Sequence, residues 1–170
     1  RPYAQVVTGR AVTHSGGRTV HRVDDRWLLE LPDSLLGRDF LLVSRVAGVP
    51  TGFDGFTSAG TSVEERLVRW ERQGDRVLLR TLSQSAYADD AYGPGGAGAG
   101  PGAGAPGAPR AGATMVVDVT DFFGGDTPAL SGLTAEQRRR YQVRRLDPAR
   151  SFVTGVRAFP LNVEVRHTQT

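Results

Sequence analysis

One stretch of the chain restricts its fold more than any other, because residues 93–112 consist of Gly, Ala and Pro apart from Arg110. These residues offer almost no apolar side-chain surface to a core, and they favour neither helix nor strand. The stretch holds nine of the 22 Gly, so the rest of the 170-residue chain has an ordinary globular composition. We therefore predict one domain over residues 1–170 that carries a disordered low-complexity insert at 93–112.

The residues on either side of this insert form short apolar runs separated by turn residues. The runs are rich in β-branched and aromatic residues, as is typical of strands. Asp24–Asp25 is a predicted two-residue hairpin turn, and residues 39–49 are apolar enough for a buried strand. The predicted strands are 19–23, 26–31, 39–49, the hairpin 66–81, 114–119, 151–158 and 161–168. The chain is thus predicted to be mainly β, an antiparallel sandwich or barrel-like sheet with one or two short helices.

Two segments carry the signals of short helices. In residues 32–37, Asp33 is placed to cap the free N–H groups of a helical turn, and Gly37 can adopt the left-handed conformation that ends it. Further along, Thr134 and Gln137 have the spacing of a capping box, in which each side chain bonds the backbone N–H of the other residue. We therefore predict a helix that begins at Thr134.

The positive charge of the chain is concentrated in one short segment. All 21 basic residues are Arg, and the formal net charge is +3. Residues 1–92 are neutral overall, whereas residues 136–150 carry six Arg against Glu136 and Asp147. A nucleic-acid-binding module shows a broader basic face interleaved with aromatic side chains, so no nucleic-acid partner is predicted. The arginines within Arg138–Arg145 are predicted to pair with those two acids on a solvated surface, and contact with an acidic partner is the alternative.

Several classes of structure are excluded by composition. The chain has no Cys, which excludes disulfides, thiolate metal sites and Cys nucleophiles. No apolar run approaches the roughly 18 residues of a transmembrane helix, so no membrane span is predicted.

The chain begins without Met and without a signal sequence, and it ends within a strand-like pattern. We therefore expect it to be a fragment of a longer protein.

Two glycine-containing segments resemble functional motifs in part of their sequence but lack the features that those motifs require. Gly93, Gly95 and Gly98 form Gly-x-Gly-x-x-Gly, but a dinucleotide site needs this motif between a strand and a helix. Ser58 has Gly two residues after it and Phe two residues before it, whereas a nucleophile elbow needs Gly on both sides. Neither motif therefore predicts a cofactor-binding or catalytic residue.

The histidines and the aspartates after residue 117 give no metal-binding pattern. His14, His21 and His167 are too scattered for a local zinc motif and are predicted to be partly exposed strand residues. Three aspartates follow the predicted strand 114–119, namely Asp118, Asp121 and Asp126. Their spacing does not fit a calcium-binding EF-hand loop, and turns or caps are the simpler prediction. The sequence thus predicts no catalytic, metal-binding or cofactor-binding residue.

Six blocks of sequence nevertheless resemble a known family. They include Leu-Leu-Gly-Arg-Asp-Phe-Leu-Leu-Val-Ser-Arg at 35–45, Val-Asp-Val-Thr-Asp-Phe-Phe at 117–123 and Ala-Phe-Pro-Leu-Asn-Val-Glu-Val at 158–165. The other three blocks are 68–72, 75–80 and 146–152. In this order and spacing, the blocks resemble the N-terminal domain of unknown function of large bacterial zinc-dependent metalloproteases.

That resemblance implies an exported protein, whether periplasmic, outer-membrane-associated or extracellular. In the family, this domain precedes a metzincin-like catalytic domain whose zinc is held by His-Glu-x-x-His and a third His. The present chain contains no His-Glu-x-x-His. The resemblance therefore implies a non-catalytic accessory domain that packs on or gates the catalytic domain of the same polypeptide, with zinc held downstream.

Two other functions remain open from the sequence. The first is a free-standing cell-envelope module that binds peptide or glycan through Phe53, Phe56 and the Trp residues. The second is an Arg-dependent binder of nucleic acid or of an anionic surface, whose affinity would fall steeply with salt.

Overall fold

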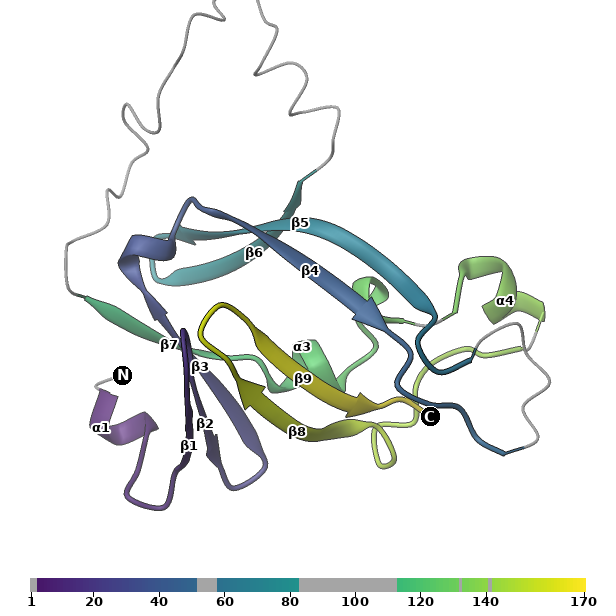
Figure 1. Ribbon diagram of the computed structural model, residues 1–170, viewed down its shortest axis with the longest axis horizontal. Coiled ribbons are helices and arrows are strands. Elements are labelled where there is room, and N and C mark those ends of the chain that lie inside the picture. Colours follow the sequence, from purple (N-terminus) through teal and green to yellow (C-terminus); the bar gives the residue numbers. More distant parts are fainter. Residues whose placement is uncertain (1–2, 52–57, 83–112, 132, 141) are drawn as a thin grey trace, which may run out of the picture. The chain divides into compact units, whose positions relative to one another are not determined.

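The computed structural model describes residues 3–51, 58–82, 113–131, 133–140 and 142–170 (Figure 1). Strands predominate in these residues, as predicted, and the helices are short. The strands are β1 Val12–Ser15, β2 Thr19–Val23, β3 Arg26–Pro32, β4 Asp39–Arg45, β5 Ser62–Gln73, β6 Arg76–Leu82, β7 Thr114–Asp118, β8 Phe152–Ala158 and β9 Val163–Thr168. The α-helices are α1 Tyr3–Val6, α3 Thr120–Gly124 and α4 Ala135–Arg140, and the 3-10 helices are η1 Asp33–Leu35 and η2 Pro128–Leu130.

The strands form three open sheets. The first has the order β1-β2-β3-β7, the second β4-β5-β6, and the third consists of β8 and β9. The pairs β1–β2, β2–β3, β5–β6 and β8–β9 are antiparallel. The predicted mainly β, antiparallel fold class is thereby confirmed, in the form of open sheets without a closed barrel in the described part of the chain.

Both predicted hairpins are present: the one at Asp24–Asp25 and the one within residues 66–81. Val23 pairs with Arg26 across Asp24–Asp25, and Asp24 adopts a positive φ of 54°. Gln73 pairs with Arg76, and Gly74 has a φ of 59°. Tight turns of this length match the right-handed twist of the strands when central residues have positive φ. Asp and Gly tolerate that conformation better than most residues, which explains why these residues occupy the two turns.

The chain divides into two compact units. Unit 1 comprises residues 1–31, 43–64 and 114–170, and unit 2 comprises residues 32–42 and 65–113. Unit 1 contains the first sheet and the β8–β9 hairpin. Strands β4 and β5 each have residues in both units.

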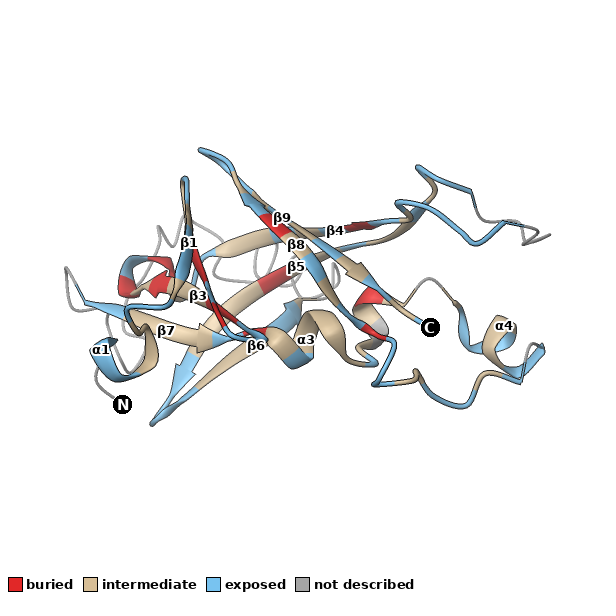
Figure 2. Cartoon of the chain, turned by 90° about the horizontal axis from the view of Figure 1, so that it is seen from below, coloured by how far each residue is buried: buried red, intermediate tan, exposed pale blue. Residues whose placement is uncertain are grey.

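The core of unit 1 lies around β2 and β3. Leu28 and Leu31 are the largest fully buried side chains, with 0% and 1% exposure. Figure 2 colours the buried residues red, among them those of β3. The remaining buried apolar residues of this unit are Val20, Val23, Trp27, Val119, Leu130 and Val156. Helix α3 contacts both β8 and β9, and β8 contacts β1 and β2. The β8–β9 hairpin is therefore attached to the sheet β1-β2-β3-β7 within the same unit.

Unit 2 is organised around the 3-10 turn η1 and the β5–β6 hairpin. Leu35 in η1 and Val68 in β5 are buried. Gly37 follows η1 with a positive φ of 74°, as predicted, and its N–H donates to the carbonyl of Trp70 at 2.9 Å. Arg69 Nε donates to Asp39 Oδ1 at 2.7 Å. These contacts attach η1 and the start of β4 to β5.

Three local predictions need correction. The strand predicted at 39–49 ends at Arg45, and it is not buried, because Leu41 and Val43 are 62% and 42% exposed. Alternate side chains of a strand point to opposite faces of its sheet, so an apolar run is no guarantee of burial on both faces. Asp33 does not cap η1 with its side chain: it is the first residue of that turn, and Pro32 precedes it as the N-cap.

Residues 120–140 contain one helix that was not predicted and one that was. Residues 120–124 form α3, which the sequence analysis did not predict, since two adjacent Phe do not give a helical period. The predicted capping box is present: Thr134 N donates to Gln137 Oε1 at 2.8 Å, and Gln137 N donates to Thr134 Oγ1 at 3.2 Å. No helix in the described residues is long and apolar enough to cross a membrane.

Candidate functional site

A group of polar side chains in unit 1 surrounds the ring of His21, which is only 3% exposed. His21 lies on β2, directly opposite Thr13 of β1 and Leu28 of β3. Residues opposite one another share a face of the sheet, and Glu30 lies two residues beyond Leu28 on that same face. The backbone register therefore brings Thr13 and Glu30 to the two sides of His21. We call Tyr3, Thr13, His21 and Glu30 the His21 cluster.

The cluster is fully connected by hydrogen bonds. His21 Nε2 lies 2.8 Å from Glu30 Oε1, and His21 Nδ1 lies 2.8 Å from Thr13 Oγ1. The hydroxyl of Tyr3, from helix α1, donates to Glu30 Oε1 at 2.5 Å and lies 3.2 Å from His21 Nε2. A proton on Nε2 would face the carboxylate, and Nδ1 could then accept the hydrogen bond of the Thr13 hydroxyl. Both ring nitrogens are thus satisfied although the ring is buried.

The hydrogen bonds also determine the ionisation of the cluster. Burial by itself raises the pKa of Glu30, but the hydrogen bonds from Tyr3 and His21 outweigh this effect and lower the pKa below its ordinary value. The hydrogen bond to Glu30 raises the pKa of Tyr3, since the phenolate would face a carboxylate. The cluster therefore favours an ionised Glu30 beside a protonated Tyr3.

The order hydroxyl, imidazole and carboxylate in Thr13, His21 and Glu30 is formally that of a nucleophile, a base and an orienting acid. The geometry, however, fits a structural role. The His21 side chain is 4% exposed, and each of its ring nitrogens is occupied by a neighbouring side chain. Because the four residues come from α1, β1, β2 and β3, the cluster ties these elements together. A catalytic base must also reach a substrate, and a ring that is only 4% exposed does not offer that access.

The pH dependence of stability tests this role of Glu30. Its pKa is lower in the folded than in the unfolded chain, so its contribution to stability is present above the unfolded value of about 4.5. The contribution is lost as the pH falls through the lower, folded pKa. We expect Glu30→Gln to lower the free energy of unfolding at pH 7 and to have progressively less effect below pH ~4.5. Urea unfolding of both proteins at several pH values measures this difference.

Glu136→Gln, in the exposed first turn of α4, is the matched control, because it makes the same substitution at an exposed residue outside the His21 cluster. A difference between Glu30→Gln and wild type that stays constant from pH 7 to pH 3 would contradict the proposed ionisation.

The structure places the three histidines in different surroundings. The prediction that all are partly exposed is wrong for His21. His14 lies against Trp27 on the other face of the sheet, with ring centroids 6.0 Å apart, and Arg22 lies 5.5 Å from the Trp27 ring. His167 on β9 is half-buried, and burial lowers its pKa. Within the described ranges, no group of three or more His, Cys, Asp or Glu side chains is placed to hold a metal ion.

Of the three aspartates after residue 117, Asp118 stabilises a local turn, as predicted. Asp118 Oδ1 accepts hydrogen bonds from the backbone N–H of Thr120 at 3.1 Å and from its hydroxyl at 2.6 Å. Arg26 donates to Asp118 Oδ2 at 2.9 Å. Burial alone would raise the pKa of Asp118, but these bonds lower it. Asp118 thus joins β3 to the start of α3.

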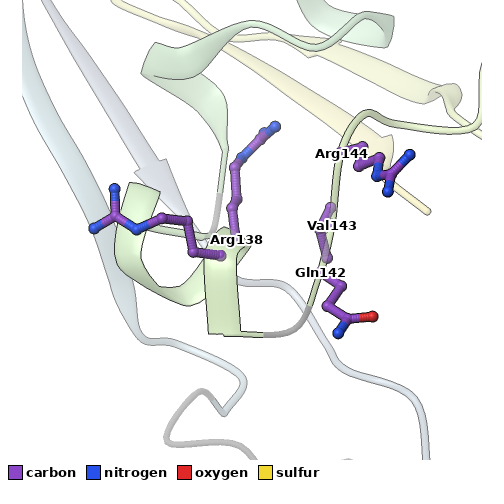
Figure 3. Close-up of a pocket in the computed structure, with 5 residues that line it drawn as sticks. Arg138, Gln142, Val143 and Arg144 are labelled. Carbon is purple, nitrogen blue, oxygen red and sulfur yellow. The ribbon is translucent and has the colours of Figure 1, made fainter.

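The arginine-rich segment lines an open hollow of about 670 Å³ formed by Arg138, Arg139, Gln142, Val143 and Arg144. Arg138 donates two hydrogen bonds to Asp126, at 3.0 and 2.5 Å, and a third to Ser131 Oγ at 2.8 Å. The hydrogen bond from Arg138 lowers the pKa of Asp126. Figure 3 shows that Gln142 and Arg144 point away from α4. The polar groups of the hollow therefore do not converge on one point as they would around a bound anion.

The ion pairs of this segment differ from the predicted ones. Arg138 pairs with Asp126, not with Glu136, and Asp147 pairs with Arg150 at 3.0 Å. Asp126 was missed because it lies 12 residues before Arg138, beyond the helical spacing that sequence reasoning considers.

Some sequence motifs lie outside the described residues. These are the insert with Gly93, Gly95 and Gly98, and the Phe53 and Phe56 loop. Ser58 is described: its backbone N–H donates to Thr61 Oγ1 at 3.1 Å, in a local turn. Trp27, one of the two Trp proposed for a binding surface, is 5% exposed and belongs to the core.

Comparison with known proteins gives two family matches. Residues 1–49 match a domain of unknown function (DUF5118), and residues 108–170 match a second domain of unknown function (DUF5117). No curated protein and no solved structure matches the chain. The expected relationship to domains of unknown function is thereby confirmed. The His21 cluster lies entirely within the first match, and the β8–β9 hairpin lies within the second.

Proposed function

We propose that this chain is a non-catalytic accessory module of an exported bacterial zinc-dependent metalloprotease. In this proposal it packs on or gates a catalytic domain further along the same polypeptide. The observation that carries the proposal is the resemblance of six sequence blocks, in order, to the N-terminal region of such proteases. Block 35–45 falls within the first family match, and blocks 117–123, 146–152 and 158–165 fall within the second.

The use of polar groups within unit 1 supports a non-catalytic role. The imidazole of His21 is bonded on both sides, and Glu30 accepts bonds from two side chains. Arg138 is bonded to Asp126 and Ser131. These groups stabilise the module itself, and contact with a partner is then left to its exposed surface.

The proposal predicts where zinc and peptidase activity reside. We expect the polypeptide extended downstream of residue 170 to contain about one zinc per chain and to cleave a denatured protein substrate in a chelator-sensitive manner. Residues 1–170 alone should hold no zinc and show no cleavage. Metal content by mass spectrometry and release of labelled peptides measure the two properties.

The same pair of proteins distinguishes the two parts of the proposal. Stoichiometric zinc or cleavage in residues 1–170 would refute the non-catalytic role. An extended polypeptide without zinc would refute the peptidase assignment. A third protein, the extended polypeptide without residues 1–170, tests gating, because its cleavage rate or its solubility should differ from that of the complete chain.

A further inference from the structure

Four exposed arginines lie close together at the end of α4 and in the loop that follows it. They are Arg139, Arg140, Arg144 and Arg145, and we call them the arginine cluster. The sequence predicts that arginines of this segment pair with its own acids. The structure does not pair the cluster in this way, and its four side chains form no ion pair with any residue of the described ranges.

The carboxylates near the cluster are largely bound to other arginines. Asp126 accepts two hydrogen bonds from Arg138, and Asp147 pairs with Arg150 at 3.0 Å. Glu136, in the exposed first turn of α4, is the remaining acid of this segment. The cluster therefore presents four positive charges to solvent against one carboxylate that is not already paired within the described residues.

Exposed arginines without an ion pair in the described part of the chain also occur elsewhere. They lie in separate segments, namely before β4, in β5, in β6 and in β8, and are Arg38, Arg72, Arg76 and Arg157. The cluster differs from these because its four members fall within residues 139–145. Like charges at this density repel one another, so a partner that supplies negative charge would be attracted to this surface.

The geometry of the cluster suits several separate anions better than one. The hollow beside α4 is open, and Arg144 points away from that helix (Figure 3). A single phosphate or carboxylate is bound by donors that converge on it. Arginines that diverge reach separate anions. A surface of anionic lipids supplies these, because its headgroups diffuse laterally and can gather beneath each side chain.

Other polyanions fit this surface less well. A stable protein partner buries about 800 Å² on each side, around a centre that is largely apolar. The hollow, as described, has one apolar lining residue, the half-buried Val143. Single-stranded nucleic acids are held by stacking on aromatic side chains, and the described residues between 135 and 150 include none. Groups of about four to eight basic residues are typical of surfaces that bind anionic lipids.

We propose that the arginine cluster binds the anionic headgroups of a lipid surface and thereby holds this module reversibly at a membrane. Binding is electrostatic, without insertion of an apolar side chain into the bilayer. Each arginine close to an anionic surface strengthens binding about fivefold at low salt. The inference does not depend on the proposed function, because it uses only charges within this chain.

Sedimentation of the chain with lipid vesicles tests the inference. The vesicles contain equal parts of phosphatidylglycerol and phosphatidylcholine, or phosphatidylcholine alone, at about 0.05 M NaCl. We expect wild type to bind only the vesicles with phosphatidylglycerol, and to bind them at least about tenfold more weakly at about 0.5 M NaCl. A cluster variant should lose at least about tenfold in partition coefficient. It combines Arg139→Gln, Arg140→Gln, Arg144→Gln and Arg145→Gln.

A control variant with the same formal net charge separates the cluster from the total charge. It combines Arg38→Gln, Arg72→Gln, Arg76→Gln and Arg157→Gln, all at exposed positions outside the cluster. We expect its partition coefficient to stay within about threefold of wild type. Urea unfolding verifies that both variants remain folded. An equal loss of binding in the two variants would overturn the inference, because binding would then follow net charge alone.

Replacing all four arginines of the cluster with Lys distinguishes a lipid surface from a partner of defined shape. Lys keeps the charge but lacks the planar guanidinium that binds a carboxylate or phosphate through two hydrogen bonds. We expect the Lys variant to bind within about threefold of wild type. A tenfold loss would contradict binding to a fluid surface.

The partner itself is tested with wild type. Failure to bind the phosphatidylglycerol vesicles would overturn the inference. Release from these vesicles by an equal concentration of charge in polyglutamate or in a single-stranded oligonucleotide would also overturn it, since the cluster would then prefer an acidic protein or a nucleic acid.

Discussion

Replacing Gly17 with Ala will destabilise the protein by about 3 kcal/mol, the upper part of the range for overpacking a site that cannot relax. The new Cβ would lie 1.7 Å from the carbonyl oxygen and 2.5 Å from the carbonyl carbon of Pro160. These neighbours are backbone atoms, so no flexible side chain can move aside. Either turn must shift, and the hydrogen bond from Gly17 to Phe159 is lost with it. Urea unfolding followed by fluorescence of the buried Trp27 measures the change.

Gly9→Ala is the matched control. No atom lies within 4 Å of a Cβ built on Gly9, and its φ is not in the left-handed region. We expect the control to stay within about 0.5 kcal/mol of wild type. If the two variants unfold at the same urea concentration, the close approach of the β1–β2 and β8–β9 turns is wrong.

Replacing His21 with Ala will lower the free energy of unfolding by about 3 kcal/mol as well, because two destabilising effects add. The substitution leaves a cavity beside the fully buried Leu28, and losses of this kind from a core are typically a few kcal/mol. It also removes the hydrogen bonds of the ring to Thr13 and to the ionised Glu30, and hydrogen bonds to a charged group contribute more to stability than neutral ones. Urea unfolding at pH 7 measures the loss.

His14→Ala is the control for this prediction, since His14 lies one strand away on the opposite face and is only half-buried. We expect His14→Ala to lower the free energy of unfolding by less than about 1 kcal/mol. A double mutant of His21→Ala with Glu30→Gln should be less destabilised than the sum of the two single variants, because the two residues share a hydrogen bond. Strict additivity, or equal losses of stability for His14→Ala and His21→Ala, would refute the stabilising role of the His21 cluster.

Local features of the chain were predictable wherever one residue type has a dominant conformational preference. The hairpins at Asp24–Asp25 and Gly74 follow from residues that tolerate positive φ, and the capping box follows from the spacing of Thr134 and Gln137. Each of these involves groups no more than a few residues apart. Their energetics therefore depend little on the rest of the fold.

The candidate site was not predictable in the same way. The alternation of Thr19, His21 and Val23 indicates that these side chains share a face of β2, and this was the available signal for a buried His21. It does not reveal that Thr13 and Glu30 flank the ring, since their positions depend on the pairing of β2 with both neighbours. Likewise, the strand β4 is as apolar as a buried strand, yet Leu41 and Val43 are exposed.

The sequence alone determined the mainly β class, the position of the turns and the low-complexity composition of residues 93–112, because these depend on local conformational preferences. Only the tertiary structure decided that His21 is buried and bonded on both sides, and that Gly17 meets the turn at Pro160. Both depend on contacts between segments far apart in the chain, about 140 residues in the case of Gly17 and Pro160. Such contacts arise from strand register and packing, which no local pattern of residues specifies.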